Sequence, residues 1–232
     1  ASFVQSSGLP ARLIAPMSKG AALADEIIGP YEPYPDEEYL SQLPEALPNV
    51  EIVDIGQVEY YKTDHHWTSR GAYQAYCAYM RAVGGQPSPE DAYEKVAREG
   101  FYGTTYAQSG YFASSSDTME MWVSDWNASA FHWEKLDGYD MYQVFLGGDV
   151  GVDVLDSPSA PEGTLLLFKD SFADALAPFL MQHYSRIVLV DLRYARNTDL
   201  AELVAEYAPQ EILFVADAMT GQDAVTVAEA FN

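Results

Sequence analysis

The most regular part of the sequence is TLLLFKDSFADALAPFLMQHYSRIVLVDLRYARNTDLAELVAEYAPQEILFV, residues 164–215. Short apolar runs of strand length alternate in it with segments of helical periodicity. Strands that are apolar on both faces and alternate with helices form a parallel sheet covered by helices on both sides. The stretch therefore predicts an α/β sandwich. The expected order is strand, helix, strand, helix, strand, over 164–168, Phe172 to Tyr184, Arg186 to Val190, Asp199 to Tyr207 and Glu211 to Val215.

The sequence before this stretch predicts more irregular structure. A helix capped by Thr68 or Ser69 should run to the glycine pair at 84–85. We expect one domain, 1–232, with an insertion of short strands and loops at about 86–160. The other predicted segments are a strand at 11–15, loop and helix at 17–28, a connector at 29–35, a helix at 36–46, and strands at 50–55, 101–106, 118–123 and 142–148.

Charge and composition exclude several classes of partner. The 232 residues carry 35 acidic and 12 basic side chains, a formal charge of −23. Such a chain repels nucleic-acid backbones and anionic membrane surfaces. The single cysteine, Cys77, allows no internal disulfide, and no run of residues is apolar enough to span a membrane. The chain begins with alanine, so we expect a targeting segment to be missing from it.

A second motif, YYKTDHHWTSRGA at residues 60–72, concentrates chemically active side chains. Side chains alternate on extended backbone, so Asp64 and His66 should face together while His65 faces away. A carboxylate beside an imidazole is the acid–base half of a serine hydrolase triad. The alternative is structural: Asp64 holds a turn and His66 is a half-buried imidazole.

The loop Lys169-Asp170-Ser171-Phe172 offers the nucleophile. Functional residues of parallel sheets gather at the carboxyl ends of the strands, and Ser171 would stand there at the start of a helix. Free backbone N–H groups at a helix start stabilise a developing oxyanion. The alternative is that Asp170 or Ser171 only caps the helix.

These two motifs resemble the bacterial DHHW protein family, which is similar to the SGNH-hydrolase-like domains of the alginate O-acetylation proteins. The resemblance rests on YKTDHHWT with the following GAY, on KDSFADALAPFL running into IVLVDLRY, and on FYGT at 101–104 and FLGG at 145–148. It covers about residues 11–216. It implies a three-layer, flavodoxin-like domain in which the motif order is permuted relative to ordinary SGNH hydrolases.

The resemblance assigns a role to each motif residue. Ser171 is the nucleophile, His66 the general base and Asp64 the carboxylate that orients it, while His65 has no catalytic role. Ordinary SGNH hydrolases have glycine where this chain has Lys169, which could equally be a solvated surface charge. The oxyanion-hole donors are not evident, with Gly147-Gly148 and Asn197 as candidates. Residues expected to line a substrate or oxyanion pocket are Arg193, Tyr194, Lys169 and Tyr61.

Three functions are consistent with the sequence. The first is serine-dependent acetyl transfer to, or ester hydrolysis on, an envelope or extracellular carbohydrate, without a cofactor or metal. The resemblance further implies an exported bacterial protein with a membrane acyl-carrier partner. The second is a catalytically weak carbohydrate-binding or assembly protein. The third is metal-dependent hydrolysis using Asp64, His65, His66 and His132 or His183, which lacks the usual spacing of a zinc site.

Overall fold

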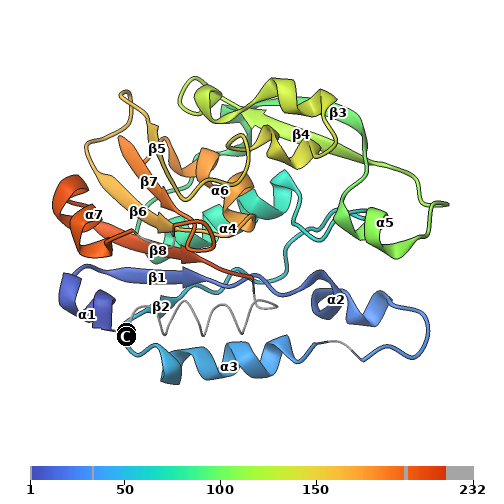
Figure 1. Ribbon diagram of the computed structural model, residues 1–232, viewed down its shortest axis with the longest axis horizontal. Helices are drawn as coiled ribbons and strands as arrows, with labels where there is room; N and C mark the ends of the chain where they lie inside the picture. Colours follow the sequence, from blue (N-terminus) through green and yellow to red (C-terminus); the bar gives the residue numbers. More distant parts are fainter. Residues whose placement is uncertain (1, 33, 196–197, 218–232) are drawn as a thin grey trace.

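A six-stranded sheet forms the centre of the computed structural model, which describes residues 2–32, 34–195 and 198–217 (Figure 1). The strand order is β2-β1-β8-β6-β7-β5. Neighbouring strands run parallel except β5, which pairs antiparallel with β7 at one edge. The predicted α/β class is confirmed. The strands are β1 (Ala11–Ile14), β2 (Glu51–Ile52), β5 (Val152–Asp156), β6 (Thr164–Phe168), β7 (Arg186–Val190) and β8 (Glu211–Val215).

The sheet is the middle of three layers. Leu165 and Leu167 of β6 point into a core shared with α4 (Ser69–Ala82) and α6 (Phe172–Leu180). Leu166 and Phe168 point the other way, into a core with α1 (Ser2–Ser7) and α7 (Leu200–Tyr207). Both faces of the strand are thus buried, which is why its sequence is continuously apolar. Helix α6 ends earlier than its sequence suggested.

The carboxyl ends of the parallel strands meet at one edge of the sheet. The arrowheads of β1 and β8 point toward this edge, at the right of Figure 1. The segment after β6 contains Ser171, and the segment after β7 contains Arg193. Parallel pairing of β6 with β7 therefore brings both residues to the same end of the molecule.

A second, two-stranded sheet stands apart from the central one. Strands β3 (Glu94–Phe101) and β4 (Asp117–Val123) pair antiparallel, and α5 (Thr104–Ser109) lies in the connection between them. Strand β5 lies in the range expected for the insertion but joins the central sheet. The division into one domain with an insertion stays a prediction.

Some predicted strands take other forms. The segment expected as a strand at 142–148 contains a 3-10 helix, Met141–Val144, and a turn in which Leu146, Gly147 and Gly148 all have positive φ, which strands exclude. The segment at 101–106 divides between the end of β3 and α5. Only β2 forms within 50–55.

The remaining helices are short or lie near the N-terminus. They are α2 (Lys19–Ala22), α3 (Asp36–Ala46) and the 3-10 helices Ala24–Glu26, Glu90–Ala92, Ala128–Ala130 and Trp133–Asp137. Helix α4 begins after Thr68, whose hydroxyl accepts the Gly71 N–H at 3.1 Å, as predicted for its cap. Within the described part of the chain, every helix falls short of the length and apolarity needed to cross a bilayer.

Candidate active site

Ser171 stands between the tip of β6 and the first turn of α6. Its Oγ lies 2.7 Å from Nε2 of His66, and it makes no capping bond to the helix. The capping interaction belongs instead to Asp170, whose Oδ1 accepts the Phe172 N–H at 2.9 Å. Asp170 therefore caps the helix, as one alternative predicted, and the Ser171 hydroxyl bonds the imidazole of His66 instead.

His66 is held by Asp64 on its other side. Oδ1 of Asp64 lies 2.5 Å from His66 Nδ1 and accepts the His66 backbone N–H at 2.9 Å. Burial by itself raises the pKa of the Asp64 carboxyl, but the hydrogen bond and charge of His66 outweigh it and lower that pKa far below its ordinary value. An ionised carboxylate only accepts, so Nδ1 carries the proton and Nε2 is left to accept from Ser171.

The second carboxylate oxygen of Asp64 is fixed by α5. Oδ2 accepts the backbone N–H of Thr104 at 2.7 Å and its hydroxyl at 3.1 Å. Asp117, at the start of β4, holds the same loop by accepting the N–H groups of Lys62 at 3.0 Å and Thr63 at 2.7 Å. The segment containing β3, α5 and β4 thus positions the acid of the relay.

The motif loop is bent rather than extended, which corrects the prediction for His65. The His65 ring lies 3.7 Å from the His66 ring, centroid to centroid, and its Nδ1 lies 2.6 Å from Thr104 Oγ1. It does not face away, because Asp64 accepts the N–H two residues on and curls the backbone into a turn. Burial, and then the repulsion that a protonated His66 would exert, lower the pKa of His65 to about 4, so the His65 ring is neutral at pH 7.

The hypothesis of metal-dependent hydrolysis gains little from this geometry. Asp64, His65 and His66 bring ligand atoms within 4.8 Å of one another. Both ring nitrogens of His66 are already engaged, however, by Asp64 and Ser171. His183 bonds Tyr76 Oη at 2.6 Å, His132 lies 3.4 Å from Glu134, and neither belongs to this group. The donor set fits a proton relay better than an ion.

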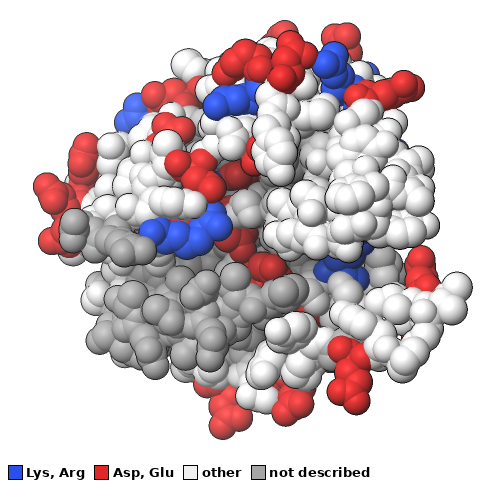
Figure 2. All heavy atoms as spheres, turned by 45° about the vertical axis from the view of Figure 1, so that its right-hand side comes forward, with Lys and Arg blue, Asp and Glu red and all other residues white. Residues whose placement is uncertain are grey.

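A cavity of about 160 Å³ opens beside the Ser171 hydroxyl, and we call it the triad cavity. Figure 2 shows a face with a hollow near its centre, in which acidic atoms are visible, with basic side chains on both sides of the hollow and a wide uncharged area beside it. The triad itself lines the cavity, together with Thr104, Asp140, Tyr142, Gln143, Gly148, Asp149, Asp174 and Arg193.

Two of the predicted pocket residues lie at or near the triad cavity. Arg193 lines it, and its guanidinium is held by Asp191 at 2.6 Å and Asp149 at 3.3 Å. Tyr194 does not line it. The Tyr194 side chain is 54% exposed, and its hydroxyl donates to Asp149 at 3.1 Å.

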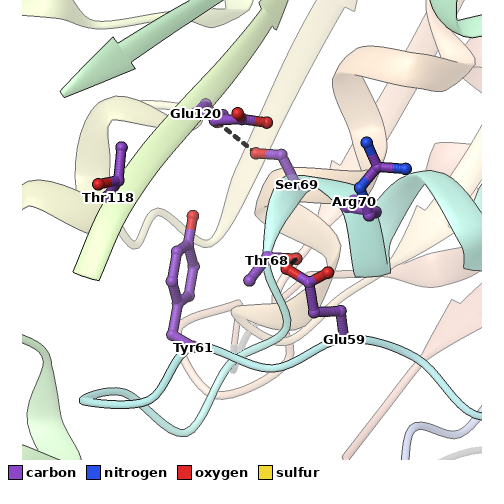
Figure 3. Close-up of a pocket in the computed structure, with 7 residues that line it drawn as sticks. All are labelled: Glu59, Tyr61, Thr68, Ser69, Arg70, Thr118 and Glu120. Carbon is purple, nitrogen blue, oxygen red and sulfur yellow. Dashed lines mark hydrogen bonds between the residues drawn. The ribbon is translucent and has the colours of Figure 1, made fainter. Parts of the chain in front are cut away.

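Lys169 and Tyr61 lie elsewhere. Lys169 is buried, with Nζ 2.7 Å from Asp174 Oδ1, so the surface-charge alternative is wrong. Burial raises the pKa of Asp174 to about 7, although the charge of Lys169 opposes the rise. Tyr61 lines a second cavity of about 170 Å³ (Figure 3), where Ser69 Oγ donates to the backbone carbonyl of Glu120.

Backbone N–H groups suited to an oxyanion are present beside the nucleophile. Within the described residues, the N–H groups of Ser171 and Gly148 donate to no protein acceptor. Gly148 lines the triad cavity, whereas the Gly147 N–H is occupied by the Gln143 carbonyl at 3.0 Å. The third predicted donor, Asn197, lies outside the described residues.

Two aromatic side chains that were not predicted from the sequence position the triad. The ring of Tyr142 stacks on His66 at 4.0 Å with an interplanar angle of 7°. The buried Trp67 indole donates to the Phe172 carbonyl at 3.0 Å, which ties the motif loop to the start of α6. The place of Trp67 inside the motif could have suggested its role, but nothing local marks Tyr142.

Gly103 lies against the carboxylate, and replacing it should disturb the relay. A Cβ there would stand 2.1 Å from Asp64 Oδ2 and 2.5 Å from its Cγ. The φ of Gly103, −91°, suits any residue, so the clash is the sole obstacle. We expect Gly103→Ala to displace Asp64 and lower kcat/KM for an acetyl ester by about 100-fold.

Steady-state hydrolysis of p-nitrophenyl acetate measures this effect. Gly163→Ala is the matched control, because its Cβ would meet nothing nearer than Gln210 Oε1 at 3.4 Å. Equal rates for the two variants would show that the position of Asp64 does not matter.

Comparison with known proteins places this geometry in a family. The model of the family described as DHHW protein matches residues 53–190. No curated protein sequence matches the chain. Solved structures share the fold at low identity. A DHHW family protein from Eubacterium siraeum has a TM-score of 0.74 at 21% identity, over 94% of this chain and 82% of that one.

Two further structures are similar. Bacillus cereus PatB1 with a sulfonyl adduct has a TM-score of 0.77 at 19% identity, over 94% of this chain and 84% of that one. The O-acetyltransferase domain of Pseudomonas putida AlgJ has a TM-score of 0.54 at 16% identity, over 93% and 77%. These confirm the expected fold. Because the family model covers more than half of the sequence, the chain belongs to the DHHW protein family.

Proposed function

We propose that the protein is a serine-dependent acyltransferase or esterase that moves acetyl groups on carbohydrate. The observation that carries the proposal is the continuous relay from Asp64 through His66 to Ser171, at 2.5 and 2.7 Å. An alcohol is a weak nucleophile unless a base takes its proton, and this relay supplies the base and orients it.

The proposed reaction has two halves. Ser171 Oγ attacks the ester carbonyl of the donor while His66 Nε2 takes its proton, and the N–H groups of Ser171 and Gly148 receive the developing oxyanion. His66 then protonates the leaving alcohol, which departs as the acyl-enzyme forms. In the second half an acceptor hydroxyl, or water, attacks the acyl carbon and returns a proton to Ser171 through His66. The ionised Asp64 stabilises the imidazolium in both halves.

The comparisons support the acyl group and the serine chemistry. The AlgJ domain is described as an O-acetyltransferase, and PatB1 is described with a sulfonyl adduct. Sulfonyl groups, like acyl groups, are captured by activated nucleophiles, which matches the role proposed for Ser171. Export to the cell envelope and a membrane acyl-carrier partner rest on the family resemblance and stay predictions.

Transfer of acetyl from p-nitrophenyl acetate to an oligosaccharide tests the proposal. Mass spectrometry of the glycan should show added acetyl groups with wild-type protein and none with Ser171→Ala. Release of p-nitrophenol without glycan acetylation would indicate an esterase. If the folded protein binds the glycan but yields neither product, the proposal fails and the carbohydrate-binding alternative replaces it.

A further inference from the structure

Aromatic side chains gather around α5, and we call them the α5 aromatic cluster: the exposed Tyr102, Tyr111 and Phe112 and the half-buried Tyr106. The rings of Tyr102 and Tyr106 lie 4.4 Å apart, and those of Tyr106 and Phe112 lie 5.2 Å apart. Exposure is 44% for Tyr102 and 66% for both Tyr111 and Phe112. Adjoining rings left open to solvent typically mark a binding surface.

The cluster adjoins the triad cavity through Thr104. This residue starts α5, lines the cavity and bonds both Asp64 and His65. Tyr102 lies two residues before Thr104, and Tyr106 lies two residues after it. The cluster and the triad cavity therefore meet at the first turn of α5.

The charge of the cavity determines which ligands it favours. Asp140, Asp149 and Asp174 line it, while Arg193 is the one lysine or arginine among its described lining residues. That guanidinium is already held by Asp149 and by Asp191 behind it. Asp149 is thus paired with Arg193, and Asp174 with the buried Lys169, so neither cation is left as a free positive charge in the cavity, and Asp140 adds a further carboxylate. The chain around the cavity has a formal charge of −23. Hydroxyl and ammonium groups are favoured there, and anions are repelled.

We propose that the α5 aromatic cluster is the subsite for the acceptor glycan, and that this acceptor is uncharged or carries amino groups rather than carboxylates or phosphates. The proposal rests on the proposed function, of which it names the acceptor class. Tyrosine rings offer flat apolar faces for sugar rings and polar tips for their hydroxyls. In this proposal the cluster holds one part of the glycan while another sugar of the same chain enters the triad cavity and presents a hydroxyl to the acyl carbon on Ser171. That hydroxyl forms the new ester as the Ser171 ester breaks, and its proton passes to Ser171 through His66.

Glycan binding to Ser171→Ala, measured by titration calorimetry, tests the subsite without turnover. The probes are chitohexaose, its fully deacetylated form, and hexagalacturonate as the anion. We expect the first two to bind and the third to bind at least about tenfold more weakly, with the difference shrinking in high salt. In the same background, Tyr102→Ala and Phe112→Ala should each weaken binding of chitohexaose by about tenfold. Tyr39→Ala, on the distant α3 and 49% exposed, is the matched control.

A second measurement separates this inference from the proposed function. With Ser171 present, Tyr102→Ala and Phe112→Ala should slow acetylation of chitohexaose while hydrolysis of p-nitrophenyl acetate stays within about twofold of wild type. Ring variants that bind and acetylate like Tyr39→Ala would overturn the subsite, as would hexagalacturonate bound as tightly as chitohexaose. Absence of Ser171-dependent hydrolysis would overturn the proposed function, and the binding titrations would still decide the subsite.

Discussion

Ser171→Ala is expected to lower kcat/KM for p-nitrophenyl acetate by at least about 10⁴-fold. The variant removes the oxygen that would attack the ester, and neighbouring hydroxyls do not replace it at Nε2 of His66. The free energy of unfolding should change little, by about 1 kcal/mol, because one hydrogen bond is lost. Hydrolysis rates and a urea unfolding curve of the same preparation measure the two effects separately.

Ser41→Ala provides the control for this experiment. Ser41 is exposed on α3 and donates only to the Glu38 carbonyl, so its removal should leave the rate unchanged. If Ser171→Ala retained wild-type activity, the hydroxyl would be a structural feature and another nucleophile would be required.

Asp64→Asn should cost about 10⁴-fold in activity and leave more residual hydrolysis than Ser171→Ala. Asp64 accepts four hydrogen bonds, two on each oxygen, from His66 and Thr104. The amide nitrogen of asparagine cannot accept a hydrogen bond. Either the two bonds from His66 or the two bonds from Thr104 are therefore lost in Asp64→Asn. The imidazole then loses its orientation and the charge that stabilises its protonated form. The pKa of Asp64 lies so far below its ordinary value that its carboxylate stays ionised between pH 7 and pH 4, so the loss in Asp64→Asn should be measured at one fixed pH.

Asp125→Asn, at an exposed carboxylate outside the triad cavity, controls for the change of charge. The rates of the two variants, with unfolding curves to show that each is folded, decide the role of Asp64. Asp64→Asn within about tenfold of wild type would mean that the carboxylate only anchors the loop.

The last third of the fold was predictable because its strands are buried on both faces. Leu165 to Leu167 alternate between two cores, so every position is apolar and the pattern needs no knowledge of the partner strands. Strand β3 gave no such pattern, because most of its side chains are exposed and many are charged. Strand β5 was missed for a related reason: it lies at the sheet edge and its residues are only partly buried.

The sequence predicted a site residue only where a chemically reactive side chain stands at the end of a strand or the start of a helix. Asp64, His66 and Ser171 are recognisable by residue type and by their places before a helix and after a strand. The orientation of His65 was not predicted, because a local bond from the His66 N–H to Asp64 bends the loop, and Thr104 and Asp117, which are far away in the sequence, hold it there. The burial of Lys169 likewise depends on Asp174, whose carboxylate faces it only once α6 has packed against the sheet.

Labelling with a fluorophosphonate probe, followed by peptide mass mapping, tests whether Ser171 is an activated nucleophile. Such a probe bonds covalently to a serine only when a base activates it. We expect stoichiometric modification of wild-type protein on the peptide that contains Ser171, and none of Ser171→Ala. Folded wild-type protein that stays unmodified, or carries the label on another residue, would contradict the claim that the relay from Asp64 through His66 activates Ser171.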